Sequence, residues 1–359
     1  MTTARTSEIL RELCNAHGVS GYEDDVRSLV ENYVRPLVHE IRTDALGSLI
    51  AMRYASTAGA PVVMLDAHLD EIGMVVSYVE SSGFLRFALV GGWDERVLPA
   101  HSVDIKCQNG SRVRGVIGVP PPHIQKSEDR NRPYAADNLF IDVGAVSRDE
   151  VEALGIAVGD SAVPYYPFYE QPGGSVIGKA LDNRAGCTTM IRTLEHLFSG
   201  PSPTELPVTI AAVFSTFEET GARGAAAAAF GVDPKVCLVL EGTVAGDFPG
   251  VPPARNPSRQ GAGPAITLMD RTAHCPRHLV KFLQDLATAE GIPHQLKTPI
   301  FGGTNAARIQ MSRAGILTGI ISVPCRYIHS PHATLRLEDL ESTITLATAF
   351  AKNCNKLLN

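Results

Sequence analysis

PVVMLDA, residues 61–67, is a short apolar run bounded by turn residues, which is typical of a strand buried on both faces of a sheet. Similar runs occur at 208–214, 236–240 and 318–323, and residues 48–54 also have the character of a strand. Helical stretches alternate with these runs. Because parallel strands are joined by helical crossovers, the alternation predicts an α/β fold with a mostly parallel sheet covered by helices on both faces.

The helical stretches are separated by turn residues. Residues 7–38 predict two helices with a break at GVSG, residues 18–21. Further helices are predicted at 181–198, 221–230, 278–290, 304–314 and 337–357.

Residues 72–167 have a different pattern of apolar and polar residues from the rest of the chain. Short alternating segments dominate there, and glycine and proline separate them, which is typical of a small all-β module. The chain has 359 residues, more than one compact core usually holds. We therefore expect an α/β domain made of residues 1–71 and 168–359, interrupted by an inserted β domain at 72–167. Its clearest strands are predicted at 73–79, 84–89, 102–106 and 112–117.

Composition and charge exclude several classes of protein. The net charge of −6 and the lack of a long Lys/Arg cluster argue against a nucleic-acid partner. No apolar run approaches the roughly 20 residues of a membrane span, and the N-terminus has no apolar segment of the secretory kind. The seven cysteines form no CxxC pair, so we expect neither a disulfide framework nor a thiolate zinc site. These features predict a cytoplasmic protein without membrane partners.

Chemically active side chains follow each of the buried strands. Ligands of open α/β sheets collect at the carboxyl ends of the strands, so these side chains should meet at one edge. Asp182, just before the predicted helix, can join them there. The side chains that follow the four strands in turn are His68 with Asp70, Glu218 with Glu219, Glu241, and His329 past a short loop.

Two histidines and several carboxylates without a thiolate suit divalent metal ions such as zinc or cobalt. One carboxylate can bridge two ions that lie roughly 3.5–4 Å apart. We predict that Asp182 is this bridge. His68 and Glu241 would complete one metal site, and Glu219 and His329 the other.

Two further residues are predicted to act on the reaction without binding metal. Neighbouring side chains on a loop point in different directions, so Glu218 can face the attacking water and remove its proton while Glu219 binds metal. Asp70 can accept a hydrogen bond from the far ring nitrogen of His68 and so hold the imidazole in one tautomer.

At these residues the chain resembles the tetrahedral aminopeptidase family of two-metal aminopeptidases, which includes glutamyl and leucyl types. The resemblance implies an aminopeptidase that acts on peptides with a free N-terminus. It also implies a PDZ-like inserted domain used in subunit pairing, and homo-oligomers that range from dimers to hollow tetrahedral dodecamers. The segments that carry it are AHLDEIG (67–73), KALDNR (179–184), FEETG (217–221), GGT (302–304) and PCRYIHSP (324–331).

Two positions depart from the family pattern. Glu241 stands where aspartate is usual, and its longer side chain puts the metal preference of that site in question. Asn305 stands where aspartate is common, which removes a charge close to the expected active site. We expect the pocket for the substrate side chain to form from loops around 242–251 and 299–305.

Two other functions are also compatible with the sequence. A related metal-dependent N-acyl amide hydrolase, or deacylase, would use the same two-metal chemistry but cleave substrates with blocked N-termini. A non-catalytic assembly protein on the same scaffold should have lost metal ligands, whereas here only the ligand at Glu241 is altered.

Overall fold

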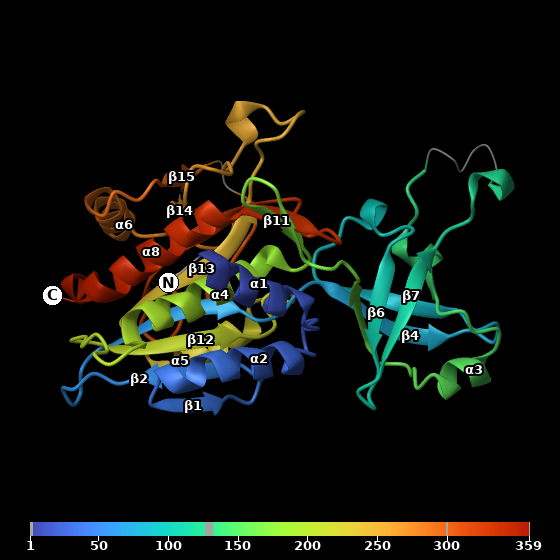
Figure 1. The fold of residues 1–359 in the computed structure, drawn as a ribbon, viewed down its shortest axis with the longest axis horizontal. Helices are drawn as coiled ribbons and strands as arrows, with labels where there is room; N and C mark the ends of the chain where they lie inside the picture. Colours follow the sequence, from blue (N-terminus) through green and yellow to red (C-terminus); the bar gives the residue numbers. More distant parts are fainter. Residues whose placement is uncertain (1–2, 126–131, 299–300, 359) are drawn as a thin grey trace.

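The strands of the protein fall into two groups, an eleven-stranded sheet and a six-stranded closed barrel. The computed structural model describes residues 3–125, 132–298 and 301–358. In Figure 1 the sheet and its helices occupy the left of the molecule, the barrel lies to the right, and both chain termini belong to the sheet side.

The four central strands of the sheet, β12, β3, β13 and β16, are mutually parallel, and antiparallel strands flank them. All seven residues of β12 are buried, as are six of the seven in β3, because both faces of these strands are covered. The order along the sheet is β1 (Glu40–Thr43), β2 (Leu49–Arg53), β12 (Thr209–Ser215), β3 (Val62–His68), β13 (Val236–Val244), β16 (Leu317–Arg326), β17 (Ala333–Arg336), β11 (Ser175–Gly178) and β10 (Tyr169–Gln171), with β14 (Ala265–Thr267) and β15 (Gln295–Lys297) paired beside β16.

Helices cover both faces of this sheet, as predicted. The chain moves in one direction across the sheet through α4 and returns through α5, so right-handed crossovers place these helices on opposite faces. The helices of this part are α1 (Thr3–Asn15), α2 (Asp24–Val34), α4 (Leu181–Phe198), α5 (Arg223–Val232), α6 (Arg277–Ala289), α7 (Ala306–Ile309) and α8 (Leu337–Asn353). The predicted α/β class is therefore confirmed, with the parallel pairing concentrated at the centre of the sheet.

The barrel lies between β3 and β11 in the sequence and has a hydrophobic core of its own. Its strands alternate between buried and half-exposed positions, as in β6, where Val103 and Ile105 point inward. On this basis we propose residues 72–167 as the inserted domain. The barrel contains, in spatial order, β4 (Gly73–Val79), β5 (Leu85–Val90), β8 (Phe140–Asp142), β7 (Arg112–Gly118), β6 (Ser102–Lys106) and β9 (Ser161–Pro164), and α3 (Arg148–Ala153) follows β8 in the chain.

One predicted helix is much shorter than expected. The stretch 304–314 predicts a helix of eleven residues, but α7 ends at Ile309. A helix cannot extend to residue 314, because Arg313 takes a left-handed backbone conformation, as does Gly315 beyond it. Among the described residues, the helices are all too short or too polar to cross a bilayer.

A buried ion-pair network ties α1 and α4 to the loop after β3. Lys179 donates to both carboxylate oxygens of Glu71, at 2.6 and 2.7 Å, and to the carbonyl oxygen of Ala16. The fully buried Arg184 donates to Glu71 at 3.1 Å and to the carbonyl oxygen of Leu13 at 3.0 Å. The network therefore fixes the loop that follows β3, where the candidate site begins.

Replacing Glu71 with alanine should lower the free energy of unfolding by about 3–5 kcal/mol, because two buried cations would lose their carboxylate partner. Urea unfolding followed by circular dichroism measures the change. The control is Asp285→Ala, which breaks the exposed ion pair to Lys281 and should cost at most about 1 kcal/mol. Equal losses in the two variants would contradict the role assigned to Glu71.

Candidate metal centre

The carboxyl ends of the parallel strands bring the predicted side chains together. His68 is the last residue of β3 and pairs in register with Ser215, the last residue of β12. The chain after β12 delivers Glu218 and Glu219, and Glu241 lies within β13. Seven positions were predicted at this edge, and the structure places all of them in one cluster: His68, Asp70, Asp182, Glu218, Glu219, Glu241 and His329.

Asp182 lies between two histidines and presents a different oxygen to each. Its Oδ1 is 3.4 Å from Nε2 of His68, and its Oδ2 is 3.7 Å from Nε2 of His329. Glu241 approaches the first histidine, at 3.6 Å from His68 Nε2. Glu219 approaches the second, at 3.6 Å from His329 Nε2. The cluster therefore contains two three-residue groups that share Asp182, and a third group that combines His68, Glu218 and Glu219.

Each group can offer ligand atoms to one metal ion. In the first, one atom from each of His68, Asp182 and Glu241 lies within 4.8 Å of the others. In the second, Asp182, Glu219 and His329 meet the same limit. Three ligands of nitrogen and oxygen, with space for a water or substrate atom, are typical of a catalytic divalent metal site.

Both imidazoles are oriented with Nε2 toward the carboxylates. Nδ1 of His68 lies 3.0 Å from the carbonyl oxygen of Asp70, and Nδ1 of His329 lies 2.7 Å from that of Gly92. A carbonyl oxygen only accepts, so each Nδ1 carries the proton and donates it. This arrangement leaves the lone pair of each neutral Nε2 free to bind a metal ion.

The concentrated negative charge of the cluster favours the binding of cations. Burial raises the pKa of Glu218 to about 7 and that of Glu219 to about 8, and it raises that of Glu241 well above its usual range. Burial acts against protonation of His329, yet the carboxylates of Asp182 and Glu219 raise its pKa to about 10. Without metal, the cluster therefore gathers protons to offset its negative charge. A metal ion would take the place of these protons.

One buried oxygen also points to a missing ligand. Oε1 of Glu241 is buried and has no hydrogen-bond partner among the described residues. A buried carboxylate oxygen without a partner is costly, and a bound cation would remove that cost. The longer side chain of Glu241 therefore still reaches the cluster at the position where the family pattern has aspartate.

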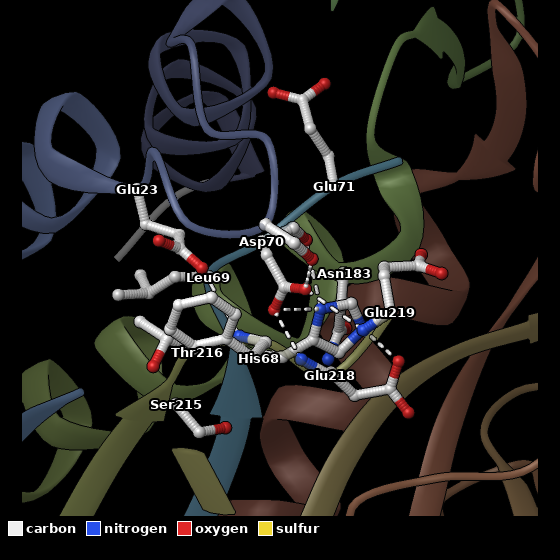
Figure 2. A network of polar contacts seen from close by, with 12 residues as sticks. Glu23, His68, Leu69, Asp70, Glu71, Asn183, Ser215, Thr216, Glu218 and Glu219 are labelled. Atoms are coloured by element: carbon white, nitrogen blue, oxygen red, sulfur yellow. Dashed lines mark hydrogen bonds and ion pairs between the residues drawn. The ribbon is translucent and has the colours of Figure 1, made fainter. Parts of the chain in front are cut away.

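Asp70 holds the loop that carries the two neighbouring glutamates (Figure 2). Its carboxylate accepts the backbone N–H of Glu218 at 2.9 Å and that of Glu219 at 3.0 Å, and Ser20 donates its hydroxyl as well. The carboxylate Oδ1 is also 3.4 Å from Nδ1 of His68, farther than the backbone carbonyl oxygen of the same aspartate. Asp70 therefore contacts His68 mainly through its backbone.

Asn305 lies beneath the pocket. Its side chain is fully buried, and its amide donates to Asp66 and to Ser215, both at 2.8 Å. Burial raises the pKa of Asp66 to about 6. The exchange of aspartate for asparagine at this position therefore changes the hydrogen bonds to Asp66 and Ser215 beneath the pocket. It does not change the charge that a substrate would meet.

Left-handed backbone at the site is a feature that the sequence did not indicate. Five residues other than glycine have positive φ at a cluster member or within three residues of one, although such conformations cost about 1–3 kcal/mol each. Strain of this kind gathers at functional sites, where the surrounding structure enforces it. The five residues and their φ angles are Ala180 (54°), Phe217 (55°), Ala222 (57°), Tyr327 (64°) and His329 (57°).

The cluster forms one wall of a pocket of about 420 Å³. Other parts of the pocket lining come from the segments 242–244 and 301–304, within the loops expected to bind the substrate side chain. Residues 299–300 of the second loop lie outside the described residues. Two cationic residues, Lys297 and Arg308, also line the pocket. The sequence patterns did not single out Lys297.

Comparison with known proteins identifies the family of this site. The sequence profile described as M42 glutamyl aminopeptidase matches residues 47–346. A lysyl aminopeptidase of Pyrococcus furiosus is 32% identical over 348 residues, which cover 95% of each chain.

Solved structures agree in fold over almost the whole chain. An aminopeptidase of the archaeon Desulfurococcus kamchatkensis is 35% identical, with a TM-score of 0.91 over 98% of this chain and 95% of that one. The TET1 peptidase of Pyrococcus horikoshii, which can assemble into a tetrahedron or a large octahedral shell, is 30% identical, with a TM-score of 0.86 over 97% of this chain and 99% of that one. The chain therefore belongs to the M42 glutamyl aminopeptidase family.

Proposed function

We propose that this chain removes N-terminal amino acids from peptides and uses two divalent metal ions to do so. The observation that carries the proposal is the position of Asp182, whose two oxygens each face a separate pair of one histidine and one glutamate. The M42 family is metal-dependent, and its named relatives include lysyl and glutamyl aminopeptidases.

The residues present suit the two ions. His68 and Glu241 would hold one of them, Glu219 and His329 the other, and Asp182 would contact both. Ligands of imidazole and carboxylate favour zinc or cobalt over magnesium or calcium. When bound, the two ions lower the pKa of a water molecule and polarise the carbonyl group of the scissile bond.

Glu218 is the proposed general base. It lies in the cluster, with Oε2 at 4.0 Å from His68 Nε2, but stands outside the two groups that share Asp182. Its carboxylate would take a proton from the attacking water and pass it to the leaving amine. The nearby carboxylates would attract the positive α-amino group of the substrate, which selects the first residue of a peptide.

The relatives also suggest how the chain assembles and where it works. We propose that the barrel acts as a PDZ-like pairing module and that dimers build a tetrahedral dodecamer, an assembly of the kind formed by the TET1 peptidase. All seven cysteines are buried and unpaired, which suits a reducing compartment and supports a cytoplasmic location.

The proposed activity predicts cleavage of aminoacyl anilides with a free amino group, and only when zinc or cobalt is present. A panel of free and N-acetylated anilides, tested with metal-free protein before and after metal addition, measures this directly. Cleavage of the acetylated compounds alone would establish the deacylase. Lack of cleavage by protein that holds two ions per chain would favour a non-catalytic assembly protein.

Glu218→Gln should lower kcat by about 10²–10⁴-fold, because a neutral amide cannot accept the proton of the water. Elemental analysis should still find two metal ions per chain in this variant. The matched variant Glu219→Gln should instead lose metal from the site shared with His329. Full turnover by Glu218→Gln would remove this residue from the role of base.

Asp70→Asn should weaken metal binding by about 10–100-fold, the range found when the support of a metal ligand is removed. The substitution places an amide N–H against a backbone N–H of Glu218 or Glu219. The repulsion displaces the loop that carries these two glutamates. Calorimetric zinc titration measures the affinity. The control is Asp94→Asn, because the carboxylate of Asp94 is bonded only to Arg96 among the described residues and lies outside the cluster. Unchanged affinity in Asp70→Asn would show that its carboxylate does not position the loop.

A further inference from the structure

The short segment before α2, residues 18–23, contacts both parts of the chain. Val19 forms a parallel β-bridge with Glu71, in the loop that follows β3. On the barrel, the carbonyl oxygen of Gly159 accepts the hydroxyl of Tyr22 at 2.7 Å. The segment is therefore fixed in position next to the candidate site.

This segment also reaches the loop that carries Glu218 and Glu219. The carboxylate of Glu23 accepts the backbone N–H of Phe217 at 3.3 Å. Asp70 accepts the next two, so three consecutive N–H groups of the loop donate to two buried carboxylates. In Figure 2, Glu23 comes from the N-terminal part of the chain and Asp70 from the loop after β3. Two segments that are distant in the sequence thus hold one loop.

The backbone of Phe217 is left-handed, with a φ angle of 55°. A residue other than glycine rarely adopts this conformation unless the surrounding structure enforces it. The ring of Phe217 packs on the backbone of Gly21, where a Cβ atom would lie 3.3 Å from the Cε1 atom of the ring. Residues 18–23 therefore hold Phe217 both by its N–H and by its ring.

The environment of Glu23 is unfavourable for a carboxylate. Its exposed fraction is 4%, and among the described residues no basic side chain forms an ion pair with it. Burial and the like charge of Asp70 raise the pKa of Glu23 to about 7. Stability alone would favour a neutral side chain at this position. A residue that lowers stability in this way is typical of a position that serves activity.

We propose that Glu23 is a positioning residue for Glu218, the proposed general base. The inference rests on the proposed function, because a hydrolase that uses Glu218 as its base needs this side chain in one place. The backbone angles of Phe217 set the direction in which the chain enters Glu218. While Glu23 holds the N–H of Phe217, these angles are fixed and the Glu218 carboxylate stays within reach of the attacking water.

The test compares two side chains of nearly the same length at position 23. Glu23→Gln keeps an oxygen that can accept the N–H of Phe217, whereas Glu23→Met has none. On the best aminoacyl anilide, zinc-loaded Glu23→Met should lose about 10–100-fold in kcat with KM within about threefold, because a displaced base slows only the chemical step. Glu23→Gln should keep most of the activity. Both variants should still hold two metal ions per chain by elemental analysis.

Hydrogen–deuterium exchange provides a second measurement that does not need turnover. The backbone N–H groups of residues 216–222 should exchange faster in Glu23→Met than in Glu23→Gln, because one of their acceptors is missing. Exchange in α4 should be the same in both variants. The control is Glu31→Met, which removes a half-exposed carboxylate paired with Arg35 at the end of α2 and should change neither exchange nor kcat.

Thermal unfolding separates positioning from a general role in stability. Glu23→Gln should melt no lower than the unaltered protein, because it removes a buried charge. A large fall in melting temperature in either variant would assign Glu23 a structural role and overturn the proposal.

The other outcomes are equally decisive. Unchanged kcat and exchange in Glu23→Met, or an equal loss of kcat in both variants, would overturn the role of the hydrogen-bond acceptor. Loss of a metal ion from Glu23→Met would also overturn the proposal, because Glu23 would then act on metal binding. If exchange rises in Glu23→Met while the unaltered protein cleaves no anilide, the positioning of the loop stands and the peptidase proposal fails.

Discussion

The arrangement of the site depends on the carboxylate of Asp182, which lies between two imidazoles. Its neighbours are also acidic, so the edge of the sheet concentrates negative charge in a place that water barely reaches. Such a cluster is stable only with compensating positive charge, either as protons on the histidines or as bound cations. The folded chain itself therefore requires compensating positive charge at this edge of the sheet.

The surrounding structure holds this unfavourable cluster in place by rigid backbone contacts. Parallel pairing fixes β3, β12 and β13 side by side, and Asp70 accepts two consecutive N–H groups from the loop with Glu218 and Glu219. Left-handed residues such as Phe217 are tolerated because these contacts determine the path of the loop. The stability of the sheet offsets the strain and the charge repulsion that the site contains.

Much of the site could be predicted from the sequence, because most of the proposed ligands lie in or after a strand with a clear apolar pattern. His68 and Glu219 are examples, since the ends of parallel strands must share an edge. The remaining features depend on how segments that are distant in the sequence pack together, which the sequence patterns do not show. Gly92 supports His329 from the inserted barrel, and Lys297 ends a three-residue strand too short to show a pattern. The environment of Asn305 depended on Asp66, 239 residues away in the chain.

The hydrogen bond from His329 to the Gly92 carbonyl has an evolutionary consequence. Gly92 belongs to the segment that follows β5 of the barrel, whereas His329 follows β16 of the sheet. One proposed ligand of the metal centre thus takes its orientation from this segment, and Trp93 anchors the segment by donating to the carbonyl oxygen of Gly73. The insert is consequently not an interchangeable accessory. Its loss or exchange in a descendant would remove the acceptor that orients this proposed metal ligand, so both parts of the chain must diverge together.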